Sequence, residues 1–142
     1  MPCSYRILPK DNLVVIAHYG TITTDENIAT LRRIRSDPEA RDDQDYLVDF
    51  SRVTTFDMDF RRMLAHVNRL QEQVPHGAGT ATAIVAPGDV GFGLARMYQS
   101  LAEGRLPFRI GVFRSRTEAM EFLGRPDAPR FRTDLVAPPD LP

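Results

Sequence analysis

The stretch TATAIVAPGDVGFGLARMYQSLAEGRLPFRIGVF, residues 80–113, decides the fold. It begins with a continuous apolar run, residues 80–86, of the kind that a buried parallel strand shows. Apolar residues then recur at helical spacing from about Val90 to Glu103, and Gly104 ends this predicted helix. A second apolar run, residues 108–113, indicates another strand. The stretch therefore predicts a strand, helix, strand unit with a right-handed crossover.

The residues before this unit continue the same alternation. Two apolar runs separated by a turn cluster predict an opening hairpin, and a Thr followed three residues later by a Glu predicts the start of a helix that ends at Pro38. An acidic loop and a third strand come next. The segments are residues 5–8 and 13–19 for the hairpin, Thr23 to Glu26 for the capping box, and residues 46–50 for the third strand.

The clearest helix pattern lies directly after the third strand. Six apolar residues fall on one stripe, and Pro75 ends the pattern: Phe60, Met63, Leu64, Val67, Leu70 and Val74. A second capping box, Ser115 to Glu118, opens a last helix that ends at Gly124. The order ββαβαβαβα predicts an α/β protein with one mixed, mostly parallel, five-stranded sheet and four helices, the first strand being an antiparallel edge.

Length and composition limit the protein class. A chain of 142 residues with 42% hydrophobic residues predicts one domain, residues 1–124, followed by a proline-rich tail, residues 125–142, that is either disordered or docked on a partner. We expect no signal peptide and no membrane span. Cys3 is the only cysteine, in a stretch that we expect to be loose, and this favours a reducing, cytoplasmic setting.

Charge is balanced, with 18 basic and 19 acidic residues. A protein that binds nucleic acid through a general phosphate-neutralising surface usually has a basic excess, so we expect no nucleic-acid partner. Of the 18 basic residues, Lys10 is the one lysine. The arginines are spread over helices and loops, which is typical of solvated faces, and we assign a function only to Arg52, Arg61 and Arg96.

The run Val48 to Phe60, VDFSRVTTFDMDF, resembles the signature region of STAS domains, the SpoIIAA-like anti-sigma-factor antagonists. Asp49, Ser51, Val53 and Asp57 stand in the family's register, and the resemblance in element order covers about residues 5–124. It implies a SpoIIAA-like fold and a regulatory module that binds a protein partner. In regulatory members the first serine after the last of these aspartates is phosphorylated, and that phosphorylation switches partner binding.

The departures from the family pattern concern that switch. Met58 stands at the phosphoacceptor position, Asp59 replaces the next serine and Phe60 replaces the glycine. Because methionine accepts no phosphoryl group, the switch is absent unless Thr54 or Thr55 takes its place. A bacterial STAS-like branch without this serine is the closer resemblance, since its members end in a Val-Phe strand and a Glu-Ala-x-x-x-Leu helix, as residues 112–113 and 118–123 do.

We therefore predict a partner-binding surface between the third strand and the helix that follows it. Its residues are Ser51, Arg52, Thr54, Thr55, Asp57, Met58, Asp59 and Arg61. The pair of aspartates has two further interpretations. They either bind a metal or cap the helix, and capping is favoured because the sequence offers no further spaced oxygen ligands. Asp59 also has the alternative of imitating a phosphorylated residue.

A second candidate is the loop between the fourth strand and its helix. Backbone N–H groups at the start of a helix bind phosphate or carboxylate, and an arginine follows one turn later. The alternative is a turn that merely needs glycine, with Phe92 packed inward. The residues of this candidate anion loop are Gly88, Asp89, Gly91, Phe92, Gly93 and Arg96.

The pattern predicts no metal, no cofactor and no catalytic motif. His18, His66 and His76 have no ligand spacing, and a Gly-x-Ser-x-Gly elbow is missing. Two functions remain. The first is a regulatory module that contacts a protein partner or a second copy at the carboxyl edge of the sheet. The second is a carrier of a small apolar or anionic ligand, based on Phe56, Phe60, Phe92 and Tyr98 near that edge. An apolar pocket above roughly 300 Å³ favours the carrier.

Overall fold

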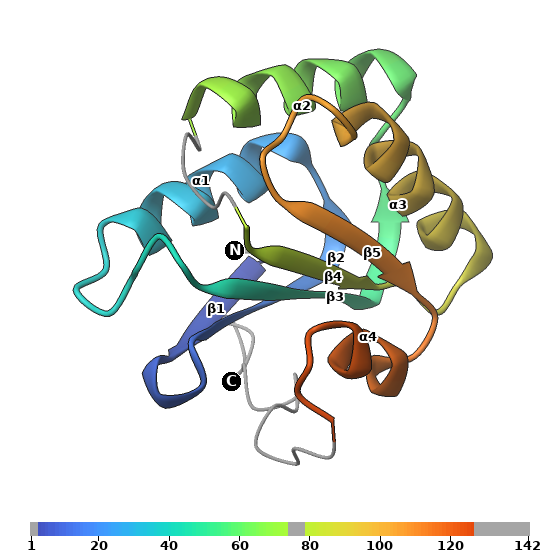
Figure 1. The fold of residues 1–142 in the computed structure, drawn as a ribbon. Coiled ribbons are helices and arrows are strands. Elements are labelled where there is room, and N and C mark those ends of the chain that lie inside the picture. Colours follow the sequence, from blue (N-terminus) through green and yellow to red (C-terminus); the bar gives the residue numbers. More distant parts are fainter. Residues whose placement is uncertain (1–2, 74–78, 127–142) are drawn as a thin grey trace, which may run out of the picture.

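The predicted α/β architecture is confirmed by a computed structural model, which describes residues 3–73 and 79–126 (Figure 1). Five strands and four helices follow one another in the predicted order ββαβαβαβα, with a short 3-10 helix, Pro9–Asp11, inside the hairpin. The elements are β1 Cys3–Leu8, β2 Leu13–Ile22, α1 Thr24–Arg35, β3 Asp45–Phe56, α2 Phe60–Gln73, β4 Ala81–Val85, α3 Asp89–Ala102, β5 Arg109–Phe113 and α4 Arg116–Phe122.

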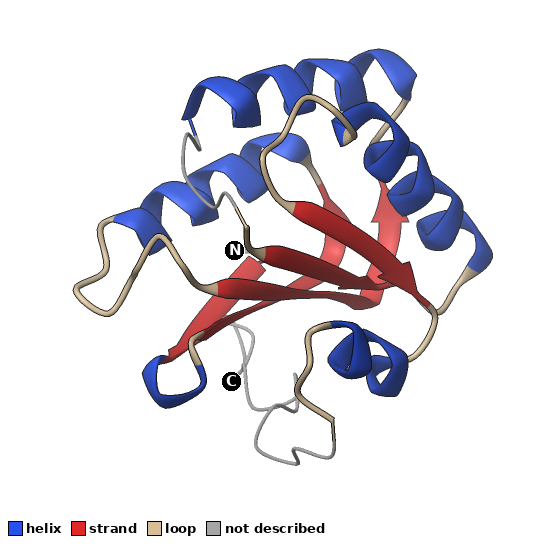
Figure 2. Ribbon diagram, in the orientation of Figure 1, coloured by secondary structure: helices blue, strands red, loops and turns tan. Residues whose placement is uncertain are grey.

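The strands lie in the sheet in their chain order, β1-β2-β3-β4-β5. β1 is antiparallel to β2, as predicted for the edge strand, and the other neighbours are parallel. Because each parallel crossover is right-handed and advances in the same direction, α1, α2 and α3 all lie on one face of the sheet. α4 follows the last strand and covers the opposite face (Figure 2).

Helix starts confirm the capping chemistry predicted from the sequence. The Thr23 side chain accepts a hydrogen bond from the Glu26 N–H at 3.2 Å, and the Ser115 hydroxyl does the same for the Glu118 N–H at 3.3 Å. Asp59 accepts from the Arg62 N–H at 2.8 Å, so its carboxylate caps α2. These contacts satisfy N–H groups that a helix leaves without partners in its first turn.

β2 and β3 are longer than predicted, so part of the predicted partner surface lies within a strand. Residues 51–56 belong to β3, where Arg52 pairs with Tyr19 and Phe56 with Ile22. The register shifts near Gly20, which has a φ of +62°. β4 pairs with β3 only as far as Asp49, so the last part of β3 extends beyond its neighbour on that side. The sequence pattern did not predict this extension of β3, because the exposed side chains of the extension are polar.

The structure describes residues near both ends of the chain for which the sequence made predictions. The prediction that Cys3 lies in a loose segment is wrong: the residue is fully buried in β1, and its Sγ lies 3.8 Å from His18 Nε2. Arg125, the first residue of the predicted tail, pairs with Asp45 at 2.7 Å and donates to the Asp11 carbonyl at 2.9 Å. The rest of that tail from residue 127 lies outside the described residues.

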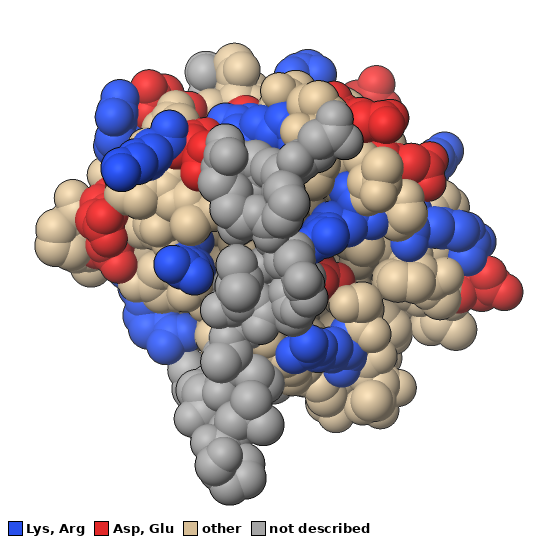
Figure 3. Space-filling view, turned by 90° about the horizontal axis from the view of Figure 1, so that it is seen from below, with Lys and Arg blue, Asp and Glu red and all other residues tan. Residues whose placement is uncertain are grey.

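The side chains of the sheet form two separate cores. On the α4 face, Leu13, Val15, Leu47, Ala83 and Ala119 belong to one buried cluster. On the other face, a second cluster lies along the strands, and a third lies between the three helices. The side of the molecule that carries α4 shows Lys or Arg interspersed with Asp or Glu around the part drawn in grey (Figure 3). This mixture agrees with the expectation of solvated faces.

Candidate functional site

α2 is held above the sheet by its two neighbouring helices. It packs against α1 and α3 and makes few close approaches to the strands. The apolar cluster that holds it there contains Ile28 from α1, Val67 and Leu70 from α2, Ala102 at the end of α3 and Leu106 from the segment that follows. α2 therefore forms a roof, and a cavity of about 350 Å³ lies between this roof and the sheet.

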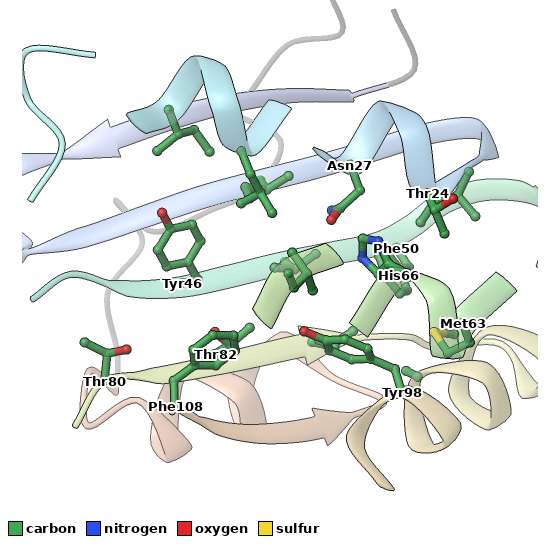
Figure 4. Close-up of a pocket in the computed structure, with 18 of the residues that line it drawn as sticks. Thr24, Asn27, Tyr46, Phe50, Met63, His66, Thr80, Thr82, Tyr98 and Phe108 are labelled. Carbon is green, nitrogen blue, oxygen red and sulfur yellow. The ribbon is translucent and has the colours of Figure 1, made fainter. Parts of the chain in front are cut away.

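The cavity is lined mainly by apolar side chains from all four of its walls. In Figure 4, the strands lie behind, α1 and α3 stand on opposite sides, and labelled side chains from both helices and from the strands surround the space. The lining residues include Ile16, Tyr46, Val48, Phe50, Thr82 and Ile84 from the sheet, Asn27, Leu31 and Ile34 from α1, Met63, His66 and Leu70 from α2, and Leu94, Ala95 and Tyr98 from α3.

The size and the mainly apolar lining of the cavity are together typical of a ligand pocket. Protein interiors pack like organic crystals and leave few voids larger than one water molecule. Ligand pockets occupy about 300–1,000 Å³ and are lined by apolar side chains with a few polar groups. A cavity of about 350 Å³ with this lining falls in that range. The arrangement is therefore suited to a small molecule with a largely apolar body.

One polar cluster lies beside the roof. His66, on α2, is 6% exposed, and its Nδ1 is buried without a hydrogen-bond partner among the described residues. Asn27 points into the cavity from α1, on the side where His66 and Phe50 lie (Figure 4). The Asn27 amide nitrogen is 3.4 Å from Nε2 of His18, which stands behind it on β2. The cluster thus presents an imidazole and an amide to an otherwise apolar space.

Both histidines of this cluster are neutral at pH 7. Burial lowers the pKa of His66 to about 4, and the nearby Arg69 charge acts in the same direction while Asp25 opposes it. Burial also lowers the pKa of His18 to about 4, with His66 adding to the effect and Asp49 opposing it. A neutral imidazole has one nitrogen that donates and one that accepts. His66 is therefore a hydrogen-bonding group rather than a charge.

The opposite end of the cavity carries the charged lining residues. Arg35 and Arg41 lie there with Asp42, near the amino ends of the parallel strands. Arg35 donates to the Gln73 carbonyl, and Arg41 lies 3.4 Å from the Asp43 carboxylate. Burial raises the pKa of Tyr46, Asp42 adds to this effect, and Arg35 opposes it. Each arginine thus already has an oxygen partner within the protein.

The predicted partner surface is spread over several environments. Ser51, Arg52, Thr54 and Thr55 are exposed on the β3 extension, and Arg61 is exposed on α2. Asp57 pairs with Arg62, and Asp59 caps the helix. Met58 is the member of this set that lines the cavity.

The predicted anion loop carries its own negative charge. Gly88 precedes α3, and Asp89 in the first turn pairs with Arg114 at 2.8 Å. The Arg114 guanidinium lies 4.4 Å from the Phe92 ring centre, and Gly91 faces Phe56 closely. Because the Asp89 carboxylate already complements the helix dipole, a second anion gains little there. Gly93 and Arg96 are exposed on α3.

The cavity brings together residues that the sequence pattern did not single out, above all Asn27, Tyr46, His66 and Thr82. The available signal was His66 itself, a polar residue three positions after Met63 and four before Leu70 on an apolar helix stripe. Of the aromatic residues predicted around a pocket, Phe56 and Tyr98 line it. Phe60, by contrast, is 57% exposed, because it begins α2 at the edge of the roof.

A search of known protein families and of curated proteins finds no match to this chain. Within the described residues, no group of three or more His, Cys, Asp or Glu is placed to hold a metal ion. No helix in residues 3–73 and 79–126 has the length and apolar character needed to cross a bilayer. The candidate site therefore has to be interpreted from its own geometry.

Proposed function

We propose that this protein binds a small, largely apolar molecule in the cavity between α2 and the sheet, as a carrier or as a module that senses its ligand. The observation that carries the proposal is the volume of about 350 Å³ lined by mainly apolar side chains. Each 100 Å² of apolar ligand surface moved from water into such a space contributes about 2.5 kcal/mol. The STAS-like family assignment is a separate proposal, supported by the sequence motif and the element order.

Binding of N-phenyl-1-naphthylamine tests this function. The probe is uncharged and apolar, and its fluorescence rises when it leaves water. We expect saturable binding by the full chain and much weaker binding by Thr82→Phe, because Thr82 lines the cavity and a phenyl ring there occupies its volume.

The matched control is Thr55→Phe. Thr55 is also a strand threonine, but it is exposed and lies outside the cavity lining. We expect this variant to bind the probe like the unmodified chain. Equal binding by both variants would show that the probe sits on the surface, and lack of saturable binding by the unmodified chain would contradict the proposal.

A second candidate, contact with a protein partner, is supported by the carboxyl edge of the sheet. The large hydrophobic side chains exposed there are Phe60, 57% exposed, and Val90, 68% exposed, at the first turns of α2 and α3. Contiguous exposed apolar patches are typical of interaction sites, and this candidate requires that the two side chains contribute to one such patch. A pull-down from the native host with the unmodified chain and a Phe60→Ser, Val90→Ser variant tests this candidate. A partner retained equally by both would contradict it.

A further inference from the structure

The imidazole of His66, which lines the cavity, carries a nitrogen without a partner in the described part of the chain. Nδ1 of His66 is buried and has no partner among the described residues, although the ring lies against the cavity. The Tyr98 ring, 6.2 Å away between ring centres, packs beside it. Leaving a buried polar atom unpaired costs about 1–3 kcal/mol, so such atoms usually meet a ligand or a water. The imidazole ring that carries this atom lines the space that the proposed function fills.

The neighbouring amide of Asn27 also lines the cavity. The Asn27 nitrogen lies beside His18 Nε2 at 3.4 Å, which leaves the amide oxygen as the acceptor. The amide group of Asn27 points into the cavity in Figure 4. An imidazole nitrogen and an amide oxygen together suit a group that both donates and accepts a hydrogen bond.

The charges around this cluster disfavour an anionic ligand. His66 is neutral at pH 7, and Arg69 beside it pairs with Asp25 at 2.8 Å. Arg35 and Arg41, at the other end of the cavity, have oxygen partners of their own. A carboxylate brought against His66 and Asn27 would lose its hydration without meeting an unpaired cation, which is costly.

We propose that the ligand is an uncharged apolar molecule that carries a hydroxyl group, and that the His66 imidazole and the Asn27 amide, which both line the cavity, recognise this hydroxyl. This inference rests on the proposed function, because it assigns the ligand class of the same cavity. The hydroxyl donates its hydrogen to the Asn27 amide oxygen and accepts a hydrogen bond from the imidazole N–H. The apolar body of the molecule lies along Phe50, Met63 and Tyr98.

Three naphthalene derivatives of similar size test the inference: 1-naphthol, 1-methylnaphthalene and 1-naphthoate. We expect the full chain to bind 1-naphthol about tenfold more tightly than 1-methylnaphthalene, which is the gain expected from one hydrogen bond. We expect 1-naphthoate to bind more weakly than both. In His66→Phe, which keeps a ring of similar shape, the preference for 1-naphthol should fall to about twofold or less.

Met120→Leu is the control variant, because Met120 is buried in the cluster under α4 and is outside the cavity lining. It should keep the tenfold preference. Equal binding of 1-naphthol and 1-methylnaphthalene by the unmodified chain would overturn this inference and leave the proposed function standing. Tightest binding of 1-naphthoate would also overturn it. Binding of none of the three would overturn the proposed function together with the inference.

Discussion

The two faces of the sheet are covered in different ways. On one face α4 lies directly on β4 and β5, where Ala81, Ala83 and Gly111 leave room for a close approach. On the other face α2 rests on α1 and α3 and leaves a cavity of about 350 Å³ above the strands. Because α2 is supported by other helices rather than by the strands, it leaves space above the sheet and still keeps its own packed contacts.

Shortening a leucine on each face gives the largest expected contrast. Leu47→Ala on the α4 face should lower the free energy of unfolding by about 3–4 kcal/mol, because the residue is fully buried in a closed cluster. Leu70→Ala, also buried but bordering the cavity, should cost about half as much, because fewer new contacts are broken. Urea denaturation of both variants measures this. Equal losses would contradict the contrast.

We expect acid to lower the stability of the fold through the two histidines on the cavity face. The pKa values of His18 and His66 are lowered to about 4 in the fold, so the unfolded chain binds more protons between pH 6.5 and pH 4. The stabilisation is complete above about pH 6.5 and is lost as the pH falls toward 4, by up to about 1.4 kcal/mol per pH unit for each histidine. His66→Phe should remove about half of this slope in urea denaturation across that range, and an unchanged slope would count against the assignment.

Enlarging a buried alanine on each face adds volume instead of removing it, and we expect a smaller difference in stability between the two faces. Ala83→Leu adds volume to the closed face and should destabilise the fold by about 2 kcal/mol. Ala95 is equally buried but lines the cavity, so Ala95→Leu should change stability by less than about 0.5 kcal/mol and reduce probe binding. Thermal denaturation compares the two variants, and a larger loss of stability for Ala95→Leu than for Ala83→Leu would contradict this expectation.

The smallest contrast concerns two glycines that each face a phenylalanine ring. A Cβ at Gly111 would come within 2.6 Å of Phe113 and 3.1 Å of Phe122, both in the closed layer, so Gly111→Ala should cost about 1 kcal/mol. A Cβ at Gly91 would come within 2.6 Å of Phe56, whose ring borders the cavity and has room to move. Because alanine also favours the helix, Gly91→Ala should be near neutral in denaturation.

The fold was predictable because local signals agree with the tertiary arrangement. The capping residues Thr23 and Ser115 accept the expected N–H groups, and the apolar run at residues 81–85 forms a buried central strand. The polar extension of β3 was missed, since residues 51–56 are held by pairing with β2 rather than by burial. Strand pairing between distant segments leaves little trace in side-chain periodicity.

The cavity was less predictable than the fold. Its walls come from three helices and three strands that are far apart in the chain, so no spacing in the sequence marks it. Phe56 and Tyr98 were expected near a pocket because they are bulky residues close to the carboxyl edge. His66 went unassigned as a cavity residue, because its meaning depends on Asn27 and His18, which only the folded chain brings near.

Methionine methyl NMR during a titration with 1-naphthol tests the central claim most directly, because methionines report on both faces. Met58 and Met63 line the cavity, whereas Met120 is buried in the closed cluster under α4. We expect saturable shifts of the Met58 and Met63 methyl signals, with the Met120 signal nearly unchanged. Shifts of Met120 equal to those of Met63, or no saturable shift of Met63, would contradict it.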